Sequence, residues 1–88
     1  MKTAKQLERY FKGAANHRRL SIILLVAASD GMTLEQIAKT LGCNIKTISE
    51  HTRRLVNAGL LNKNYQGRKV AHSLSPFGKK FVAFAKAF

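Results

Sequence analysis

The chain has 88 residues, too few for a second hydrophobic core, so we expect a single domain spanning residues 1–88. Its 16 Lys and Arg residues outnumber 4 Asp and Glu residues, which gives a formal net charge of +12. Such an excess favours a polyanionic partner, with nucleic acid ahead of an anionic membrane surface. A hydrophobic content of 45% excludes a disordered basic tail, and a single cysteine excludes an internal disulfide.

The charge is unevenly distributed along the chain. All the acidic residues lie in the first fifty residues, whereas residues 51–88 contain eight basic residues and no acidic one. We therefore expect the surface that faces a polyanion to draw mostly on the C-terminal half. The longest apolar run, 22–28, is too short for a transmembrane helix, and the roughly twenty residues before it include the acidic Glu8, unlike the start of a signal peptide, so a cytoplasmic location is expected.

The first two predicted elements are helices. Over about 3–12, apolar residues recur at helical spacing among basic ones. Over about 18–28 the chain is apolar on nearly every side, which indicates a central helix that is buried in most directions. Asp30 and Gly31 end that helix.

Two further helices follow, joined by a very short turn. Thr33 and Gln36 form a capping-box pattern at the start of the third helix, and Gly42 ends that helix after about two turns. Asn44 is a favourable N-cap for the fourth helix, which closes at Ala58 and Gly59. Apolar and small residues recur on one face of this fourth helix, at Ile45, Ile48, Thr52 and Leu55.

The rest of the chain predicts a hairpin and a last helix. Alternating residues over 60–65 and 68–74 indicate two antiparallel strands with Gly67 at the tip. Ser75 and Pro76 form an N-cap followed by a proline at the first helical position. The fold class is therefore mainly α with a small β-hairpin (α+β), in the order helix, helix, helix, helix, strand, strand, helix, which is the layout of a winged helix-turn-helix.

From about residue 16 to 75 the sequence resembles the winged helix-turn-helix domain of ArsR-type transcriptional regulators. The resemblance rests on four stretches, 17–25, 34–42, 46–51 and 55–61, which include a Thr-apolar-Ser-x-His core in the fourth helix and an Ala-Gly-Leu step after it. It implies a DNA-binding protein that dimerises through its first and last helices. In that comparison Thr52 stands where the family usually has leucine.

The resemblance does not extend to the metal sites of that family. Thr33 and Glu35 occupy the positions of its metal-sensing cysteine pair, and residues 76–88 contain no Asp, Glu, His or Cys. The three histidines are too widely spaced for a local ligand pair. We therefore expect no metal and no cofactor, and we interpret Cys43 as a small apolar filler in the turn.

The expected DNA contacts fall on three elements. In the fourth helix, which lies in the major groove, Lys46 suits guanine and Glu50 suits cytosine. The wing carries basic residues suited to the adjacent minor groove, and the start of the second helix suits a phosphate held on backbone amides and arginine. The expected DNA-binding residues are Arg18, Lys46, Thr47, Ser49, Glu50, His51, Arg53, Arg54, Lys63, Arg68 and Lys69.

Each of these assignments has a plainer alternative. Lys46, Glu50 and Arg54 also have the spacing of a solvated salt-bridge ladder, which would orient Lys46 in the free protein. The basic residues of the wing are also typical of a solvated turn, and of an exposed edge strand that they protect from pairing with another strand. His51 suits either a phosphate contact or packing beneath the helix.

The first and last helices are expected to form a dimer interface, within 1–15 and 76–88. The row of phenylalanines on the last helix is larger than one core face requires, although packing entirely within one chain is the alternative. The expected interface residues are Leu7, Tyr10, Phe11, Phe77, Phe81, Phe84 and Phe88. A two-fold dimer sets its recognition helices about 34 Å apart and predicts a pseudo-palindromic site.

The function predicted from the sequence is sequence-specific binding of double-stranded DNA by a homodimeric transcriptional regulator, acting as a repressor. No catalytic motif is present, so an enzyme is not expected. Two alternatives stay open: an architectural protein that coats DNA with little sequence preference, suggested by Lys79, Lys80 and Lys86 on the last helix, and a winged-helix module that binds protein.

Overall fold

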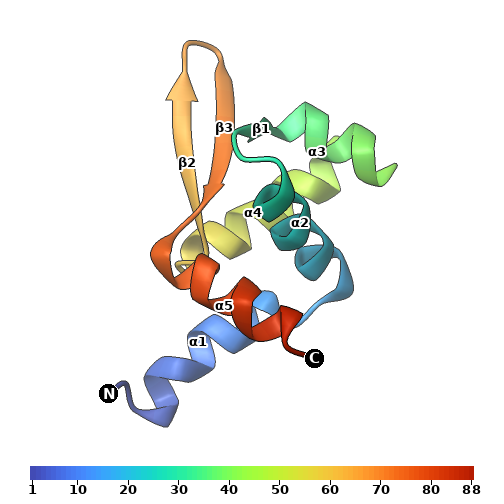
Figure 1. The fold of residues 1–88 in the computed structure, drawn as a ribbon. Coiled ribbons are helices and arrows are strands. Elements are labelled where there is room, and N and C mark those ends of the chain that lie inside the picture. Colours follow the sequence, from blue (N-terminus) through green and yellow to red (C-terminus); the bar gives the residue numbers. More distant parts are fainter.

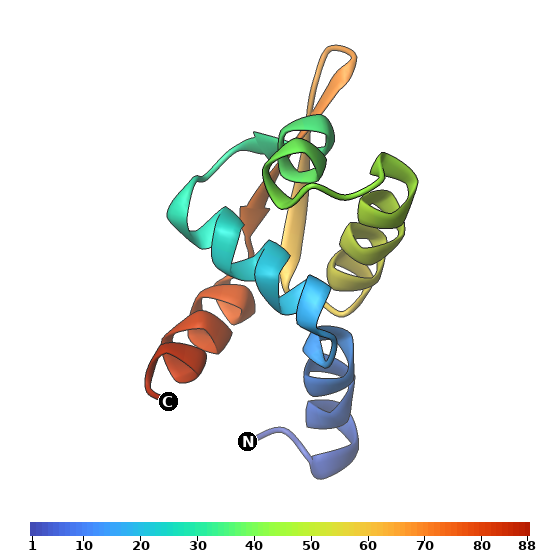
Figure 2. The same cartoon turned by 90° about the vertical axis from the view of Figure 1, so that its right-hand side faces the viewer.

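A computed structural model describes all 88 residues (Figure 1). It contains five helices and a three-stranded sheet, with the hairpin at one end of the molecule and both chain termini at the other (Figures 1 and 2). The helices are α1 (Ala4–Ala14), α2 (His17–Ala28), α3 (Leu34–Leu41), α4 (Ile45–Asn57) and α5 (Pro76–Lys86). The strands are β1 (Met32–Thr33), β2 (Leu61–Gln66) and β3 (Lys69–Leu74).

The helix-turn-helix consists of α3 and α4 and is set by local side-chain chemistry. The Thr33 hydroxyl accepts a hydrogen bond from the backbone N–H of Gln36 at 3.3 Å, and the Gln36 side chain accepts one from the N–H of Thr33 at 2.9 Å. Gly42 ends α3 in the left-handed region, with φ of 64°, where a side chain would be strained. The Asn44 side chain then accepts a hydrogen bond from the N–H of Lys46 at 2.7 Å. The predicted capping box, turn and N-cap are confirmed.

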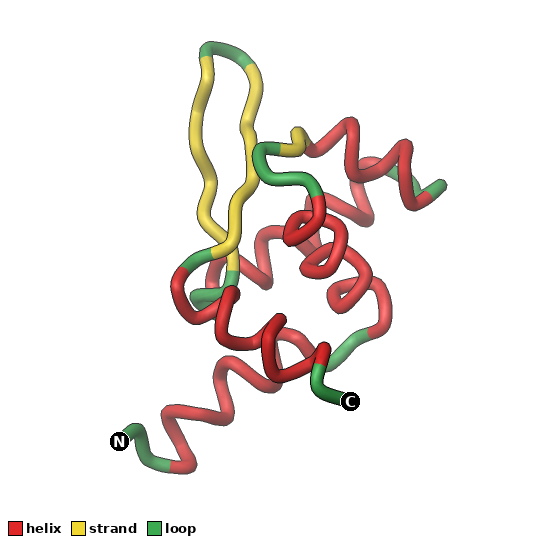
Figure 3. Tube along the Cα trace, in the orientation of Figure 1, coloured by secondary structure: helices red, strands yellow, loops and turns green.

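The sheet contains one strand more than the sequence predicts. β2 and β3 form the expected antiparallel hairpin with Gly67 at its tip, where φ is 63°. β1 adds to the other edge of β3, pairing Met32 with His72 and giving the order β1-β3-β2 (Figure 3). A two-residue strand has no alternation to detect, which explains why the predicted order lacked it. β1 therefore ties the loop after α2 to the middle of β3.

The core forms around α2, which contributes Ile22, Ile23 and Val26. α2 is less completely buried than its composition indicates, because the Leu24 side chain is 43% exposed. The expectation of burial on most sides was too broad: an apolar run cannot show which of its members meet a neighbour. The other buried core residues come from the other four helices and from the segment 58–61, namely Ala14, Ile37, Ala38, Ile48, Leu55, Ala58, Leu60, Leu61 and Val82.

Two glycines allow helices to pack unusually closely. Gly13 lies against Ala58, so that α1 touches the C-terminal end of α4, and Gly78 lies against the carbonyl oxygen of Leu60, so that α5 touches the start of the hairpin. A Cβ on either glycine would fall well under 3.0 Å from that neighbour. These contacts fix α1 and α5 on the body of the domain.

Ser75 joins the hairpin to α5 through three hydrogen bonds. Its N–H donates to the carbonyl of Leu60 at 3.1 Å, and its hydroxyl donates to the carbonyl of Gly59 at 2.6 Å. The same hydroxyl accepts from the N–H of Gly78 at 2.9 Å, which caps α5 as predicted. The end of β3, the start of β2 and the first turn of α5 are therefore tied together at one buried side chain.

α1 and α5 pack on each other through aromatic rings. The rings of Tyr10 and Phe77 lie 5.0 Å apart between centroids, and Phe11 makes edge contacts with Phe81 and Phe84 at 6.2 Å each. These contacts leave much of the aromatic surface in solvent: Phe11 is 49% exposed, Phe84 51% and Phe88 95%. The two helices are thus companions within one chain, with an apolar surface left over.

Candidate nucleic-acid interface

α4 presents one buried face and one polar face. Ile48, Thr52 and Leu55 are fully buried, and the Thr52 hydroxyl is satisfied within the helix because it donates to the carbonyl of Ser49 at 3.0 Å. A threonine is therefore accommodated here in place of leucine. The exposed residues on the opposite face are Lys46, Thr47, Ser49, Glu50, Arg53 and Arg54, all of which the sequence assigned to DNA contact.

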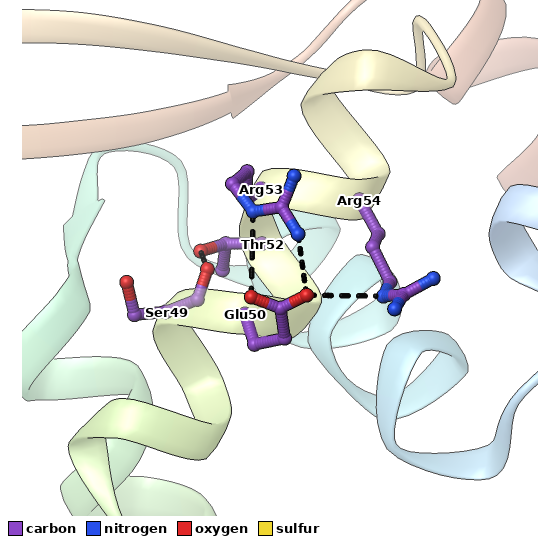
Figure 4. A network of polar contacts seen from close by, with 5 residues as sticks. All are labelled: Ser49, Glu50, Thr52, Arg53 and Arg54. Atoms are coloured by element: carbon purple, nitrogen blue, oxygen red, sulfur yellow. Dashed lines mark hydrogen bonds and ion pairs between the residues drawn. The ribbon is translucent and has the colours of Figure 1, made fainter.

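Glu50 organises the middle of this face (Figure 4). Its carboxylate accepts from Arg53 at 2.5 Å and 3.3 Å and from Arg54 at 3.3 Å, so both guanidinium groups are held beside it. The hydrogen bond from Arg53 is the main reason why the pKa of Glu50 lies below its ordinary value. The carboxylate is thus charged and already engaged.

Lys46 stays outside this network. The expected ladder from Lys46 through Glu50 to Arg54 forms only in its second half, because the three salt bridges of the chain join Glu8 to Lys12 and Glu50 to Arg53 and Arg54. The expectation that a ladder orients Lys46 was wrong, since Arg53, three residues on, competes for the same carboxylate. Lys46 instead points its charge into solvent at the start of the helix, beside a shallow polar depression shared with Asn44 and Thr47.

His51 is turned partly inward, towards α2. Its Nδ1 atom is buried without a hydrogen-bond partner. Burial lowers the pKa of His51 below its ordinary value, and the nearby charges of Arg19 and Arg18 lower it further. The position agrees with packing beneath the helix, while the ring still borders the polar depression at its start.

The wing carries its charges free of internal partners. Lys63, Arg68 and Lys69 are all exposed, and none makes a salt bridge. Ser49 of α4 lines the same small cavity, of about 210 Å³, as Lys63 and Arg68 of the wing. The fold thus brings the expected wing cations alongside the recognition helix.

The start of α2 differs from the expectation. The Asn16 side chain accepts from the N–H groups of Arg18 at 2.9 Å and Arg19 at 3.3 Å, so these amides are already occupied and do not hold a phosphate. Asn16 is thus the N-cap of α2, a position that asparagine favours. The exposed Arg18 guanidinium donates to the sulfur of Cys43, which is partly buried in the turn between α3 and α4.

The sequence-based assignment missed two groups of surface residues. Tyr65 on the wing is 76% exposed, and its alternation with Leu61 and Lys63 was the available signal. A second group from three helices, Arg9, Lys12, Arg19 and Asn57, forms a basic cleft of about 340 Å³ together with Arg53 and Arg54. No local pattern unites this second group, because its members lie up to 48 positions apart in the chain.

The structure contains neither a cluster of metal-ligating side chains nor a membrane-spanning helix. No group of three His, Cys, Asp or Glu side chains is arranged to hold a metal ion. None of the helices combines the length and the apolar character needed to traverse a bilayer.

Comparison with known proteins identifies the fold. A family model described as a helix-turn-helix domain matches residues 15–64. The winged helix-turn-helix DNA-binding domain of Mb0332 from Mycobacterium bovis, a homodimer and a possible ArsR-family regulator, is 27% identical with a TM-score of 0.86, covering 94% of this chain and 77% of that one. No curated protein sequence matches the chain significantly.

Other solved structures share the fold at lower identity. HlyU from Vibrio cholerae is 22% identical with a TM-score of 0.85, over 93% of this chain and 89% of that one. The transcriptional repressor PagR of Bacillus anthracis is 21% identical with a TM-score of 0.82, over 92% and 93%. The resemblance seen in the sequence is confirmed: the chain belongs to the helix-turn-helix domain family, in the winged form found in ArsR-type regulators.

Proposed function

We propose that the protein is a homodimeric transcriptional regulator that binds double-stranded DNA at specific sequences. The observation that carries this proposal is the exposed polar face of α4, with Lys46 free of ion pairs at its N-terminal end. A helix of this diameter fits the major groove, and its first residues reach base edges. The basic wing beside α4 then lies at the adjacent minor groove, where arginine is favoured.

The roles of the site residues follow from their surroundings. Lys46 and Thr47 are free to read bases, whereas Arg53 and Arg54, already bonded to Glu50, are better suited to phosphate. Arg18 is exposed and donates to Cys43, so it stabilises the turn between α3 and α4 and can also contact a DNA phosphate. His51 is partly buried and acts mainly by packing. The main role of Glu50 is to orient the arginines rather than to contact a base.

The aromatic surface of α1 and α5 supports association of two copies. Its exposed rings contact the partly buried rings of Tyr10 and Phe81, and the similar Mycobacterium bovis domain is a homodimer. Repression, by blocking access of polymerase in the cytoplasm, is the regulatory mode we propose, and PagR, which shares the fold, is a repressor. A catalytic activity forms no part of the proposal.

A second candidate function is architectural coating of DNA. It is favoured by the cations of α5 that lie off the recognition surface: Lys79 and Lys86 are exposed and make no salt bridge. Binding would then depend on phosphate charge alone, with a steep salt dependence and no preferred sequence.

Selection from random duplexes followed by fluorescence anisotropy separates the two. We expect the selected duplex to bind about 10³-fold or more tightly than a scrambled duplex of the same composition at the same salt concentration. Equal affinities for the two duplexes would remove the specific regulator and leave the architectural protein.

A further inference from the structure

The basic cleft between α1, α2 and α4 is unexplained by the recognition surface. Its polar lining residues are Arg9, Lys12, Arg19, Arg53, Arg54 and Asn57. The close contact of Gly13 with Ala58 forms part of its wall and holds α1 beside the C-terminal end of α4. The cleft is therefore a fixed feature of the fold, distinct from the depression around Lys46 at the other end of α4.

The charge in this cleft is not balanced from within the chain. Its five basic side chains have two acidic neighbours: Glu8 pairs with Lys12 at 3.5 Å, and Glu50 lies between Arg53 and Arg54. Arg9 and Arg19 make no salt bridge. Like charges gathered without counter-charge repel one another, so a bound anion would stabilise the arrangement.

Arg19 gives a second, independent indication. It is only partly exposed, and its Nε atom is buried with no hydrogen-bond partner. Buried guanidinium N–H groups nearly always have an acceptor, whereas the Arg19 side chain makes no hydrogen bond within the chain, so its guanidinium is a cation that the rest of the molecule does not satisfy. Asn57 offers a neutral donor on the opposite wall.

The chemistry of the lining selects the kind of anion. Four of the six polar residues are arginines, whose planar N–H forks match the oxygens of a phosphate group. Ala58 is the one hydrophobic residue of the lining, so the cleft offers little to an aromatic or aliphatic acid. Its volume of about 340 Å³ admits more than one phosphate group.

We propose that this cleft binds a phosphate group, with Arg9 and Arg19 as its principal donors and Arg53, Arg54 and Asn57 around them. The phosphate belongs either to a small phosphorylated molecule or to the DNA backbone. Only the second source rests on the proposed function. Binding of free phosphate would give the protein an anionic ligand whose site adjoins the recognition helix.

Pyrophosphate is the probe for the free ligand. Isothermal titration at 0.15 M salt is expected to show one site in the wild-type protein. Arg19→Gln and, as an exposed residue that is less critical for folding, Arg9→Gln should each weaken binding about tenfold. Lys5→Gln, which removes the same charge from the exposed surface of α1 outside the cleft, should change pyrophosphate affinity less than twofold. Thermal melting of each variant verifies that it is folded.

Duplex DNA is the probe for the other source, with the same variants measured by anisotropy over a range of salt. If the phosphate belongs to DNA, Arg9→Gln should weaken every duplex alike and lower the salt slope by about one, while Lys5→Gln should not. Pyrophosphate binding with unchanged DNA affinity assigns a free ligand. The proposal is overturned if pyrophosphate fails to bind and Arg9→Gln and Lys5→Gln bind DNA equally. None of these readouts depends on sequence preference, so they stand apart from the test of the regulator.

Discussion

Gly13 of α1 lies directly against the side chain of Ala58 at the C-terminal end of α4, leaving no room for a Cβ between them. This contact positions the first helix, and with it both the aromatic surface and one wall of the basic cleft. A glycine near the end of an ordinary helix thus has a packing role that helix propensity alone does not indicate.

We expect Gly13→Ala to destabilise the protein by about 1–3 kcal/mol, because the added methyl overpacks a buried contact. The gain of about 1 kcal/mol in helix propensity is too small to reverse the sign. Adding Ala58→Gly removes the opposing methyl and should recover most of the loss. Urea unfolding of the three proteins measures this, and a Gly13→Ala variant more stable than wild type would contradict the packing argument.

Lys46 and Arg68 should affect DNA binding in different ways. Lys46→Ala is expected to reduce discrimination between bases at one position of each half-site by about 1–3 kcal/mol, because the lysine is free to reach a base edge. Arg68→Ala should weaken all duplexes similarly and lower the salt slope by about one. Anisotropy on a panel of single-base variants tests both. Identical profiles for the two variants would argue against separate reading and anchoring roles.

Association through α1 and α5 predicts a large effect of Phe84. Phe84→Ser removes a half-exposed ring that contacts Phe11, Phe81 and Phe88, and it should weaken the dimer at least about tenfold. Tyr65→Ser, which removes a more exposed ring from the wing, serves as the matched control and should leave the dimer intact. Sedimentation equilibrium reports the result, and a monomeric wild-type protein would remove this part of the proposal.

The buried His72 makes stability depend on pH. Its Nδ1 lies 3.0 Å from the carbonyl oxygen of Met32, so that nitrogen carries a proton and donates. Burial lowers the pKa of His72 below its ordinary value, although the hydrogen bond to Met32 partly opposes this shift. The unfolded chain therefore takes up a proton first as pH falls below about 6.5, and the free energy of unfolding should decrease from there downwards.

Chemical unfolding at pH 7.5 and 5.5 measures this decrease. His51, whose pKa is also lowered, adds to it in the same direction. The decrease should therefore be smaller in His72→Gln and smaller still when His51→Gln is added. If the free energy of unfolding of the double variant fell as much as that of the wild-type protein, groups other than His72 and His51 would cause the pH dependence.

Thr52 tests whether its buried hydroxyl matters. Thr52→Val keeps the shape and removes a hydroxyl bonded only within its own helix, so the free energy of unfolding should change by less than about 1 kcal/mol. Thr52→Ser keeps the hydroxyl and removes a buried methyl, which should cost about 1 kcal/mol. Thermal unfolding ranks the pair, and the opposite order would mean that the hydroxyl, rather than the methyl, stabilises the helix.

Local chemistry explains which parts of the fold were predictable. The Thr33 capping box, the Gly42 turn and the Ser75 N-cap each depend on residues within three positions, so the chain order of helices and hairpin could be derived from the sequence. The pairing of Met32 with His72 spans 40 positions and left no local trace.

The candidate site divides in the same way. The polar face of α4 follows from helical periodicity, but the choice of Glu50 between Lys46 and Arg53 depends on side-chain geometry that periodicity does not contain. The basic cleft forms only where three helices meet, so the place of Arg19 in it could not be predicted from the residues around Arg19 in the sequence.

The three hydrogen bonds of Ser75 hold the hairpin and α5 in a fixed relative orientation. In a dimer formed through α1 and α5, the position of each wing relative to the dimer interface would therefore be fixed, because no flexible linker separates them. The distance between the two half-sites would therefore be fixed by the structure of each subunit. An operator with one added base pair between its half-sites would bind more weakly, even if its half-site sequences were unchanged.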